Sequence, residues 1–476
     1  MARLHGGNGA RARFPPLSGA MSPDAAQDPP RPAAFRRVVT NAGLLLGGRT
    51  VNAVLSLAYL AVAARGLGVT AFGVLVLIHA FAQFLGDVVK FQSWQTVIHY
   101  GAGPLAARQT TTFQQVLRLT LALDAASCAV GLTIGIAGAF VLAGPLGWGA
   151  ANAPAAAGYV LSIAFMVSAT PLGLLRLFDR FDVMAKQTAL VSLVRLVGCG
   201  LAWALKAPLE IYLLVWALGT GAGFAYLVTA SVGELKLRGL LEGFRLRGPL
   251  GKGLPGVWRF AWSTNLSATL DVAFTHVVTL AVGAMVGPAQ AGFWRLGRQV
   301  ADAIAKPAKL LTPALYPELA RIRVAEGEGQ MARLAAQVGL MTGGFSLVIV
   351  AVAAFAGAPL LGLVMGEAFA PAATLMTWQV AAAAIGIFAL PLEPMLVSLG
   401  RPGAALRVRM VVSAAFLAAL PLLMGEWGAK GAAIGLVAAA AAMALGNLGM
   451  LLRGPRGPRS QEAACEEPAS GAKDGL

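Results

Sequence analysis

Charge is scarce in this chain. Only 12% of its 476 residues are Asp, Glu, Lys or Arg, whereas 57% are hydrophobic. A soluble globule of this length needs far more polar surface than these residues can supply, so the composition excludes one. The sequence instead predicts an integral membrane protein in the inner (cytoplasmic) membrane.

Cysteine and histidine are also rare, with three and four residues. Cys128, Cys199 and Cys465 have neither the spacing of metal ligands nor that of a disulfide framework. No GxxxxGK[ST], HExxH or GxSxG motif is present. We therefore predict no cofactor, no metal and no catalytic residue, and the protein is not expected to be an enzyme.

Long apolar runs dominate the remaining sequence. A helix of about 20 residues crosses the hydrocarbon of a bilayer, and twelve stretches meet that requirement. The sequence thus predicts an all-α membrane protein with about 12 transmembrane helices. They are expected at 41–64, 71–97, 113–142, 155–177, 184–205, 209–231, 258–285, 288–317, 334–356, 370–397, 405–425 and 429–451.

The loops between these stretches alternate in charge. On one side the short loops carry only Arg65, Lys206 and Lys430, whereas the loops on the other side and both tails hold most of the remaining cations. The positive-inside rule then places both termini in the cytoplasm. It also accounts for the net charge of +16, so no nucleic-acid partner is predicted.

Two short motifs recur in the second half of the chain at nearly one offset. Gly68-Val-Thr-Ala-Phe-Gly73 returns as Gly287-Pro-Ala-Gln-Ala-Gly292, and Pro171-Leu172 returns as Pro391-Leu392. An even number of spans in the repeated unit keeps its orientation. The motifs therefore predict two six-helix lobes related as parallel repeats, with substrate bound near their interface.

The expected organisation has five parts. They are a disordered cytoplasmic tail (1–38), an N-lobe with spans 1–6 (39–231), a cytoplasmic linker (232–257), a C-lobe with spans 7–12 (258–452) and a cytoplasmic tail (453–476). Translation can start at Met1 or Met21. In the linker, Leu237, Leu240 and Phe244 at helical spacing beside several arginines predict an amphipathic helix on the membrane, with a solvated basic loop as the alternative.

The eighth span carries a polar stripe. Arg295, Arg298, Asp302, Lys306 and Lys309 fall within roughly 80° of one helical face. Ionisable residues at membrane depth are costly and normally face the bundle interior or a water-filled cavity. The alternative for the two lysines is that they extend to the cytoplasmic surface.

Three other spans present polar faces. Shifted by the offset of the two glycine motifs, the last four positions of the stripe fall on His79, Gln83, Asp87 and Lys90 of the second span. The first span carries Arg49 with Asn52, Ser56 and Tyr59, and the seventh carries Asp271 and His276. Cations exceed acids on these faces, which favours an anionic ligand, because guanidinium groups match phosphate oxygens bidentately.

These faces supply the candidate site residues. The substrate-binding candidates are Arg49, Lys90, Arg295, Arg298 and Lys306, and the ion-coupling candidates are Asp87, Asp271, His276 and Asp302. Asp87 has the alternative of pairing with Lys90, and Asp302 that of pairing with Arg298 or Lys306. Arg195 and Glu393 are interpreted as helix-packing contacts.

Three stretches resemble a known family. Arg65–Gly73, Gly287–Arg298 and Leu315–Arg321 are similar to the polysaccharide flippase branch of the multidrug/oligosaccharidyl-lipid/polysaccharide exporter (MOP) superfamily, and the resemblance covers about residues 40–452. It implies a central cavity between two lobes. It also implies transfer of an undecaprenyl-pyrophosphate-linked oligosaccharide from the cytoplasmic to the periplasmic leaflet, for polysaccharide biosynthesis.

The resemblance also implies site residues. Family arginines on the first, second and eighth helices contact the pyrophosphate; Arg49, Arg295 and Arg298 fit the first and eighth, whereas the second helix offers Lys90 instead. The alternatives are a cation-coupled multidrug or metabolite exporter of the same superfamily and a membrane scaffold for glycan enzymes. The expected partners are the lipid-linked glycan, membrane lipids and other biosynthesis proteins such as a glycan polymerase.

Overall fold

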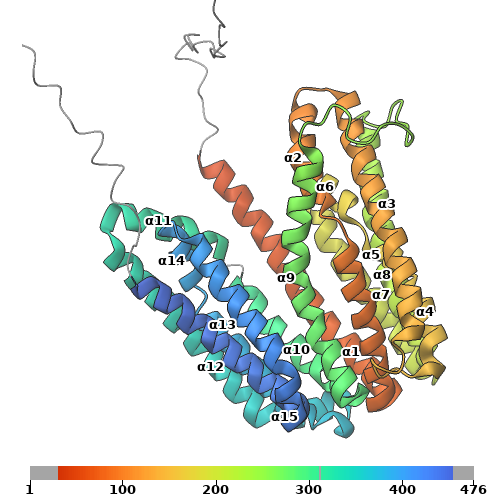
Figure 1. Cartoon of the computed structure of the whole chain (residues 1–476), viewed down its shortest axis with the longest axis vertical. Helices are drawn as coiled ribbons and strands as arrows, with labels where there is room; N and C mark the ends of the chain where they lie inside the picture. The colour runs from red at the N-terminus through yellow and green to blue at the C-terminus, as the bar shows by residue number, and fades with distance from the viewer. Residues whose placement is uncertain (1–30, 310–311, 454–476) are drawn as a thin grey trace, which may run out of the picture. The chain divides into compact units, whose positions relative to one another are not determined.

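The computed structural model describes the backbone of residues 31–309 and 312–453. Side chains are described over the same ranges except at 31–51, 266–275, 306–307, 309, 312–314, 316–317, 320 and 324. All regular structure within these ranges is helical (Figure 1). The chain divides into a short unit, residues 1–44, and a large one, residues 45–476, and the packing described below lies within the large unit.

The first half of the chain contains eight α-helices. They are α1 (Arg31–Val89), α2 (Ser93–Ala106), α3 (Thr110–Val141), α4 (Ala153–Val160), α5 (Ile163–Met166), α6 (Ala169–Leu177), α7 (Phe181–Ala204) and α8 (Leu209–Leu237), with the short 3₁₀ helix η1 (Ala150–Asn152) before α4. Because α1 begins at Arg31, its first turns replace part of the tail predicted to extend to residue 38. Pro32 fits there, since a proline is tolerated in the first turn of a helix.

The second half contains α9 (Val257–Val286), α10 (Pro288–Lys309), α11 (Thr312–Glu326), α12 (Glu328–Met365), α13 (Ala372–Phe388), α14 (Leu392–Ser398) and α15 (Pro402–Leu452), with η2 (Glu367–Phe369) before α13. Each of the twelve stretches predicted to span the membrane overlaps at least one observed helix. Among the described residues, eight helical stretches are long and apolar enough to cross a bilayer. Two of them, Asn52–Ala106 and Pro402–Leu452, contain a backbone break at Gly68 or Gly428.

Ten of the described residues with positive φ form five pairs at nearly one separation along the chain. The pairs are Gly68 and Gly287, Arg108 and Gly327, Gly149 and Gly366, Asp179 and Gly400, and Lys206 and Gly428. Gly149 precedes η1 and Gly366 precedes η2, so the short helices recur as well. The separation within each pair is nearly that of the repeated sequence motifs, so the backbone and the sequence repeat with the same period.

The linker differs from its prediction. Residues 238–256 form turns and bends rather than an amphipathic helix. Leu240 is buried in a cluster with Phe113, Leu117 and Phe178, and Leu241 and Phe244 pack against that cluster. Leu240, Leu241 and Phe244 thus pack against the protein itself, whereas Leu237, at the end of α8, is exposed.

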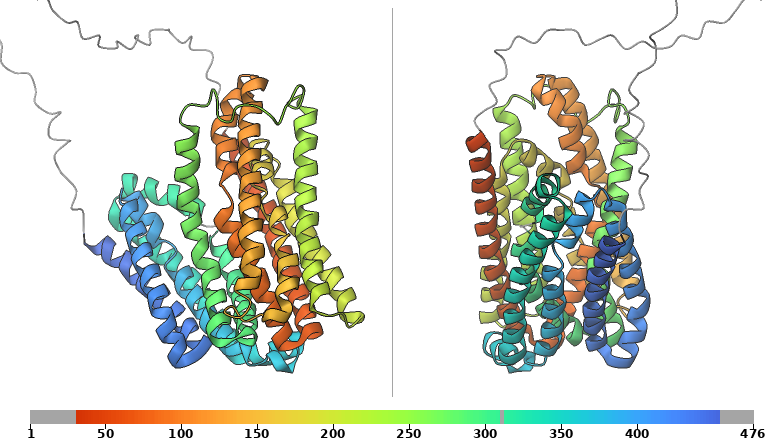
Figure 2. Two further views of the ribbon diagram at one scale, coloured as in Figure 1. Left: turned by 45° about the vertical axis from the view of Figure 1, so that its right-hand side comes forward. Right: turned by 90° about the vertical axis from the view of Figure 1, so that its left-hand side faces the viewer.

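Helix α9 contacts both halves of the chain. Its N-terminal part joins a buried cluster with α3 through Val257 and Ala261, and the ring of Phe260 stacks on His99 of α2 at 4.5 Å between centroids. Further along, α9 packs against α10 and α15 (Figures 1 and 2). In the second half, α13 packs against α10, α12 and α15.

The two halves meet most tightly at the repeated glycines. A Cβ atom placed on Gly73 would lie 1.9 Å from the carbonyl oxygen of Pro288, and one placed on Gly292 would lie 3.3 Å from Cα of Gly73. Beside this contact, Phe72 of α1 packs edge-to-face on Phe369, with ring centroids 5.7 Å apart. Only residues without a side chain allow the helices to approach this closely.

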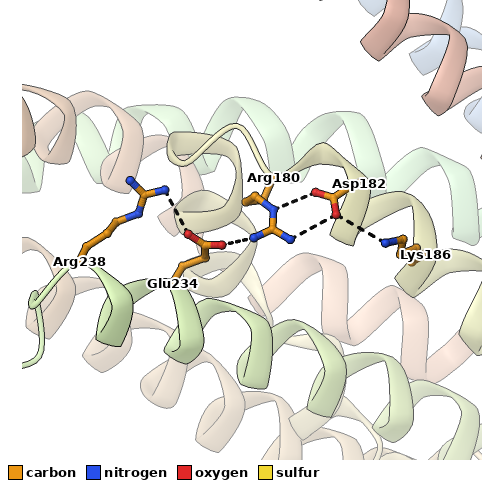
Figure 3. A network of polar contacts seen from close by, with 5 residues as sticks. All are labelled: Arg180, Asp182, Lys186, Glu234 and Arg238. Atoms are coloured by element: carbon orange, nitrogen blue, oxygen red, sulfur yellow. Dashed lines mark hydrogen bonds and ion pairs between the residues drawn. The ribbon is translucent and has the colours of Figure 1, made fainter.

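An ion-pair network ties α7 to the end of α8 (Figure 3). Arg180 pairs with Asp182 at 2.9 Å and with Glu234, whose second oxygen accepts a bond from Arg238 at 3.1 Å. Lys186 completes the network at 3.7 Å from Asp182. The hydrogen bond to Asp182, aided by the charge of Glu234, holds the pKa of the Arg180 guanidinium above its ordinary value, so this link is charged at any physiological pH.

Candidate functional site

Among the described residues, a cavity lies between the helices of each half of the chain. The N-half cavity has a volume of about 320 Å³ and is lined by α1, α5, α7 and α8, with Lys90 and Ser168 at their ends. The C-half cavity has a volume of about 450 Å³ and is lined by α9, α10, α13, α14 and α15. Both volumes are in the range of small-ligand sites.

Hydroxyl and amide groups cover much of the N-half cavity. Ser192 of α7 donates to Oδ1 of Asn52 on α1 at 2.5 Å, and its Oγ lies 3.5 Å from Oγ of Ser56. Gln83, Gln187 and other polar residues complete the wall, which consists of Asn52, Ser56, Tyr59, Gln83, Asp87, Lys90, Phe165, Met166, Ser168, Gln187, Thr188, Val191, Ser192, Arg195, Thr220, Phe224 and Leu227. Such groups act as both donors and acceptors.

Arg195 is the buried cation of this cavity. The residue is 8% exposed, and its guanidinium donates to Thr220 Oγ1 at 3.0 Å and to Tyr59 Oη at 3.4 Å. The rings of Trp216 and Tyr59 lie 5.2 and 5.7 Å from its Cζ atom. No carboxylate of the described side chains forms an ion pair with it.

Two glycines of α8 make room for the polar side chains of α7. A Cβ atom on Gly219 would lie 2.8 Å from Cγ of Arg195, and one on Gly223 would lie 2.8 Å from Nε2 of Gln187. The two glycines are one helical turn apart and therefore lie on one face. This spacing lets α7 and α8 approach closely with a cation and an amide between them.

Asp87 connects the N-half cavity to the second half of the chain. One of its oxygens lies 3.3 Å from Nζ of Lys90, and the other lies 3.2 Å from Nε2 of His276 on α9. All three side chains are partly exposed, between 21% and 27%. Since Asp87 also lines the cavity, the cavity extends to the boundary between the two halves.

His79 and Arg295 lie near the same boundary. Nδ1 of His79 is 2.7 Å from the hydroxyl of Tyr159, and its ring packs edge-on against Trp216 at 4.7 Å. Arg195 and Arg295 both lie within electrostatic range of His79. Nε of Arg295 is buried without a hydrogen-bond partner among the described atoms.

The C-half cavity contains charges of both signs. Nε of Arg298 lies 3.3 Å from Oδ1 of Asp302, and Glu393 and Arg409 complete the charged part of the lining. Gln379 donates to the carbonyl of Trp294 at 3.3 Å. Two cations are thus matched by two acids in this cavity, in contrast to the N-half cavity, where Lys90 and Arg195 face one acid.

The predicted site residues are therefore divided between places. Lys90 and Asp87 line the N-half cavity, whereas Arg298 and Asp302 line the C-half cavity. Arg295 lines neither cavity. Arg49, Lys306 and Asp271, which the sequence singled out, lie outside the side chains that the structure describes.

Local ion pairs are observed for Asp87 and Asp302, the two candidate carboxylates whose side chains the structure describes. Asp87 pairs with Lys90 three residues away, and Asp302 pairs with Arg298 four residues away, as the alternative interpretation of these acids predicted. Asp87 additionally contacts His276, which no sequence spacing indicates. His276 is thus held by a carboxylate at the boundary of the two halves.

Sequence reasoning missed four cavity residues. Arg195 and Glu393 were interpreted as packing contacts, and Gln187 and Arg409 were not singled out, yet all four line cavities. The signal for Arg195 was available, because an isolated ionisable residue within a span marks a functional position by default. Gln187 and Arg409 lie near the expected ends of their spans, where polar residues are common.

One curated relative and several solved structures are similar to the chain. No protein-family model matches it. The inner membrane protein YghQ of Escherichia coli (strain K12) is 32% identical over 344 residues, which is 72% of this chain and 96% of that protein.

Two solved structures share the fold. The inward closed conformation of the lipid II flippase MurJ has a TM-score of 0.66 at 11% identity and covers 86% of this chain and 87% of its own. The inward-facing conformation of a multidrug resistance MATE family transporter of the MOP superfamily has a TM-score of 0.64 at 13% identity. The match covers 87% of this chain and 98% of that transporter. The chain thus has the fold of these transporters.

Proposed function

The chain belongs to the family of the Escherichia coli inner membrane protein YghQ, and from this premise we propose that it is an inner-membrane flippase of the MOP superfamily. Its proposed substrate is an undecaprenyl-pyrophosphate-linked oligosaccharide, moved from the cytoplasmic to the periplasmic leaflet for polysaccharide biosynthesis. The likeness to a lipid II flippase supports a lipid-linked substrate.

The observation that carries the substrate class is the pair of arginines on α10. Arg295 holds a buried Nε without a partner among the described atoms, and Arg298 lines the C-half cavity one turn further along. Helix α10 lies at the boundary of the two halves, because its Gly292 packs on Gly73 of α1. Guanidinium groups in a low-dielectric site suit the oxygens of a pyrophosphate.

The proposed architecture is twelve spans in two six-helix lobes related as parallel repeats. The five pairs of positive-φ breaks at nearly one offset support it. Alternating access would then come from rocking of the lobes about their interface. In the described structure the two halves of the chain touch at Gly73 and Gly292, and opening at that end would release the head group.

Ion coupling is proposed at the contact between Asp87 and His276. This contact joins α1 to α9, so protonation or ion binding there would change how the lobes adhere. Asp302 and Asp271 are further candidates on α10 and α9. Transport that is indifferent to both proton and sodium gradients would remove the coupling proposal and leave the flippase proposal intact.

The direct test is thermal unfolding of the purified protein with three ligands. They are undecaprenyl-pyrophosphate sugar, the headless polyprenol and a panel of cationic drugs. A ligand that binds only the folded state stabilises it by about 2.7 kcal/mol at 100 times its dissociation constant. The proposal expects stabilisation by the pyrophosphate lipid alone.

Variants connect that result to the site. Arg295→Ala and Arg298→Ala should each reduce stabilisation by the pyrophosphate lipid. Arg407→Ala is the matched control, because Arg407 is exposed and donates to the carbonyl of Gly403 on its own helix. Stabilisation by cationic drugs and not by the lipid would instead identify an exporter, and an unchanged response of both α10 variants would remove the head-group assignment.

A further inference from the structure

The N-half cavity carries a charge that nothing in its lining balances. Asp87 offsets the charge of Lys90, so that of Arg195 remains, and no acid among the other lining residues opposes it. A buried cation without a counter-charge is costly in a medium of low dielectric. The cavity is therefore suited to a ligand with one negative charge.

The rest of the cavity wall is suited to a polyhydroxylated ligand. Asn52 and Gln83 on α1, Gln187 and Ser192 on α7, and Thr220 on α8 supply donors and acceptors from three directions. The rings of Phe165 and Phe224, with centroids 5.8 Å apart, form an apolar part of the same wall. Hydroxyl-bearing rings with one apolar face match this combination.

Specific residues shape the cavity and fix the position of its cation. Gly219 and Gly223 leave the space that Arg195 and Gln187 occupy, and Tyr59, Trp216 and Thr220 hold the guanidinium in place. A volume of about 320 Å³ accommodates a single sugar unit. Asp87 places one end of the cavity at the boundary of the halves, where a glycan would enter.

We propose that the N-half cavity binds one acidic sugar unit, of the hexuronate class, with Arg195 paired to its carboxylate. The amide and hydroxyl groups of α1, α7 and α8 would bond its hydroxyls. This inference rests on the proposed function, since the sugar would belong to the transported lipid-linked glycan. It adds a specificity site separate from the arginines of α10.

The experiment measures binding of three small probes to the full-length protein in detergent. The probes are methyl glucuronoside, methyl glucoside and acetate, compared at equal ionic strength by calorimetry. Methyl glucuronoside is expected to bind at least about tenfold more tightly than either of the others, since a charge-assisted hydrogen bond and the hydroxyl contacts both contribute.

Every other pattern overturns the inference. Equal binding of glucuronoside and glucoside would show that the charge is irrelevant, and equal binding of glucuronoside and acetate would show a site for small anions only. Absence of binding by all three would remove the site. These comparisons use the unaltered protein, so they hold even where a variant fails to fold.

Variants locate the site. Arg195→Gln should weaken glucuronoside binding about tenfold or more, whereas Arg407→Gln, at an exposed position on α15, should leave it unchanged. Gly219→Ala keeps every charge but displaces Arg195, because the added Cβ would lie 2.8 Å from its Cγ, and it should also weaken binding. If Arg195→Gln binds glucuronoside as the unaltered protein does, the acidic sugar lies elsewhere.

The probes carry neither lipid nor pyrophosphate, so this test is separate from that of the flippase. Glucuronoside binding without stabilisation by the pyrophosphate lipid would retain the sugar site and remove the flippase. Stabilisation by the lipid without glucuronoside binding would retain the flippase and remove the sugar site.

Discussion

The carboxylate of Asp87 joins two helices that are far apart in the chain, because its Oδ2 lies 3.2 Å from Nε2 of His276. Its other oxygen accepts a bond from Lys90, at 3.3 Å. One acid thus serves a neighbour on its own segment and a partner on α9. Asp87 is thus the residue at which the N-half cavity, α9 of the second half and His276 meet.

A double-mutant cycle measures that contact. Asp87→Asn, His276→Gln and the double variant should reveal a coupling energy of about 0.6 to 1.7 kcal/mol, the range found for side-chain hydrogen bonds within membranes. The readout is the free energy of unfolding in detergent. His276→Gln combined with Asp302→Asn serves as control, since Asp302 pairs with Arg298, and that combination should be additive. Additivity in both cycles would contradict the contact.

The close contact between the halves at Gly73 predicts that adding one methyl group there strongly destabilises the protein. Gly73→Ala places a Cβ atom against the backbone carbonyl of Pro288, which cannot move aside without displacing α10. We expect a loss of about 1 to 3 kcal/mol in the free energy of unfolding. Gly449→Ala on α15 is the control, because its Cβ would meet nothing within 4 Å, and it should be neutral or slightly stabilising. Equal effects at both positions would mean that the halves do not touch at Gly73.

The paired backbone breaks predict stabilising substitutions. Arg108, Asp179 and Lys206 adopt positive φ, whereas their counterparts Gly327, Gly400 and Gly428 are glycines. A left-handed conformation costs an ordinary residue about 1 to 2 kcal/mol, and the greater freedom of glycine in the unfolded chain offsets part of that gain.

Arg108→Gly and Lys206→Gly should therefore raise the free energy of unfolding by about 0.5 to 1 kcal/mol. Asp179→Gly should change it less, because aspartate tolerates this conformation. Thermal unfolding in detergent compares the three variants. A loss of stability at both Arg108 and Lys206 would show that their side chains contribute more than their backbone strain costs.

The network of Figure 3 predicts that loss of the Glu234 carboxylate destabilises the protein more than loss of the exposed Glu318 carboxylate, which lies outside the network. Glu234 is 9% exposed at its side chain and joins Arg180 to Arg238, so Glu234→Gln should lower the free energy of unfolding by about 1 kcal/mol or more. Glu318 is 43% exposed and pairs with Arg321, so Glu318→Gln should lower the free energy of unfolding by at most about 0.5 kcal/mol. Added salt should weaken the smaller effect first. A larger loss of stability for Glu318→Gln than for Glu234→Gln would contradict the prediction that the buried ion pair contributes more than the exposed one.

The length of the apolar runs predicted the helices, and the repeated glycine motifs predicted that the two halves of the chain repeat one another. Gly68 and Gly287 both adopt positive φ, and each of the twelve apolar stretches overlaps at least one helix, although only eight helical stretches of the described residues are long and apolar enough to cross a bilayer. Local pairing of Asp87 and Asp302 also followed from spacing alone, because three and four residues bring side chains together on any helix.

The division of the site between two cavities could not be predicted in this way. Periodicity assigns a residue to a face of its own helix, but it does not say which helix that face meets. Arg295 and Arg298 share one stripe, yet only Arg298 lines the C-half cavity. The contact between Asp87 and His276 and the space for Arg195 beside Gly219 depend on how separate helices pack, which no single segment encodes.

The linker illustrates the same limit. Leu240 and Phe244 have the spacing of an amphipathic helix, but they pack against a buried cluster that contains Phe113 and Phe178, and burial of apolar surface there stabilises the observed conformation. Tertiary contacts thus override a local pattern in this segment.

The contact of Gly73 with Pro288 brings backbone against backbone, and a Cβ atom placed on Gly292 would lie 3.1 Å from Cδ1 of Phe72. Interdigitated side chains resist sliding, because each must leave one hole before it enters the next. Gly73 and Gly292 have no side chain of this kind. We therefore expect resistance to sliding at this contact to come from the neighbouring ring of Phe72, which packs on Phe369, and not from the glycines themselves.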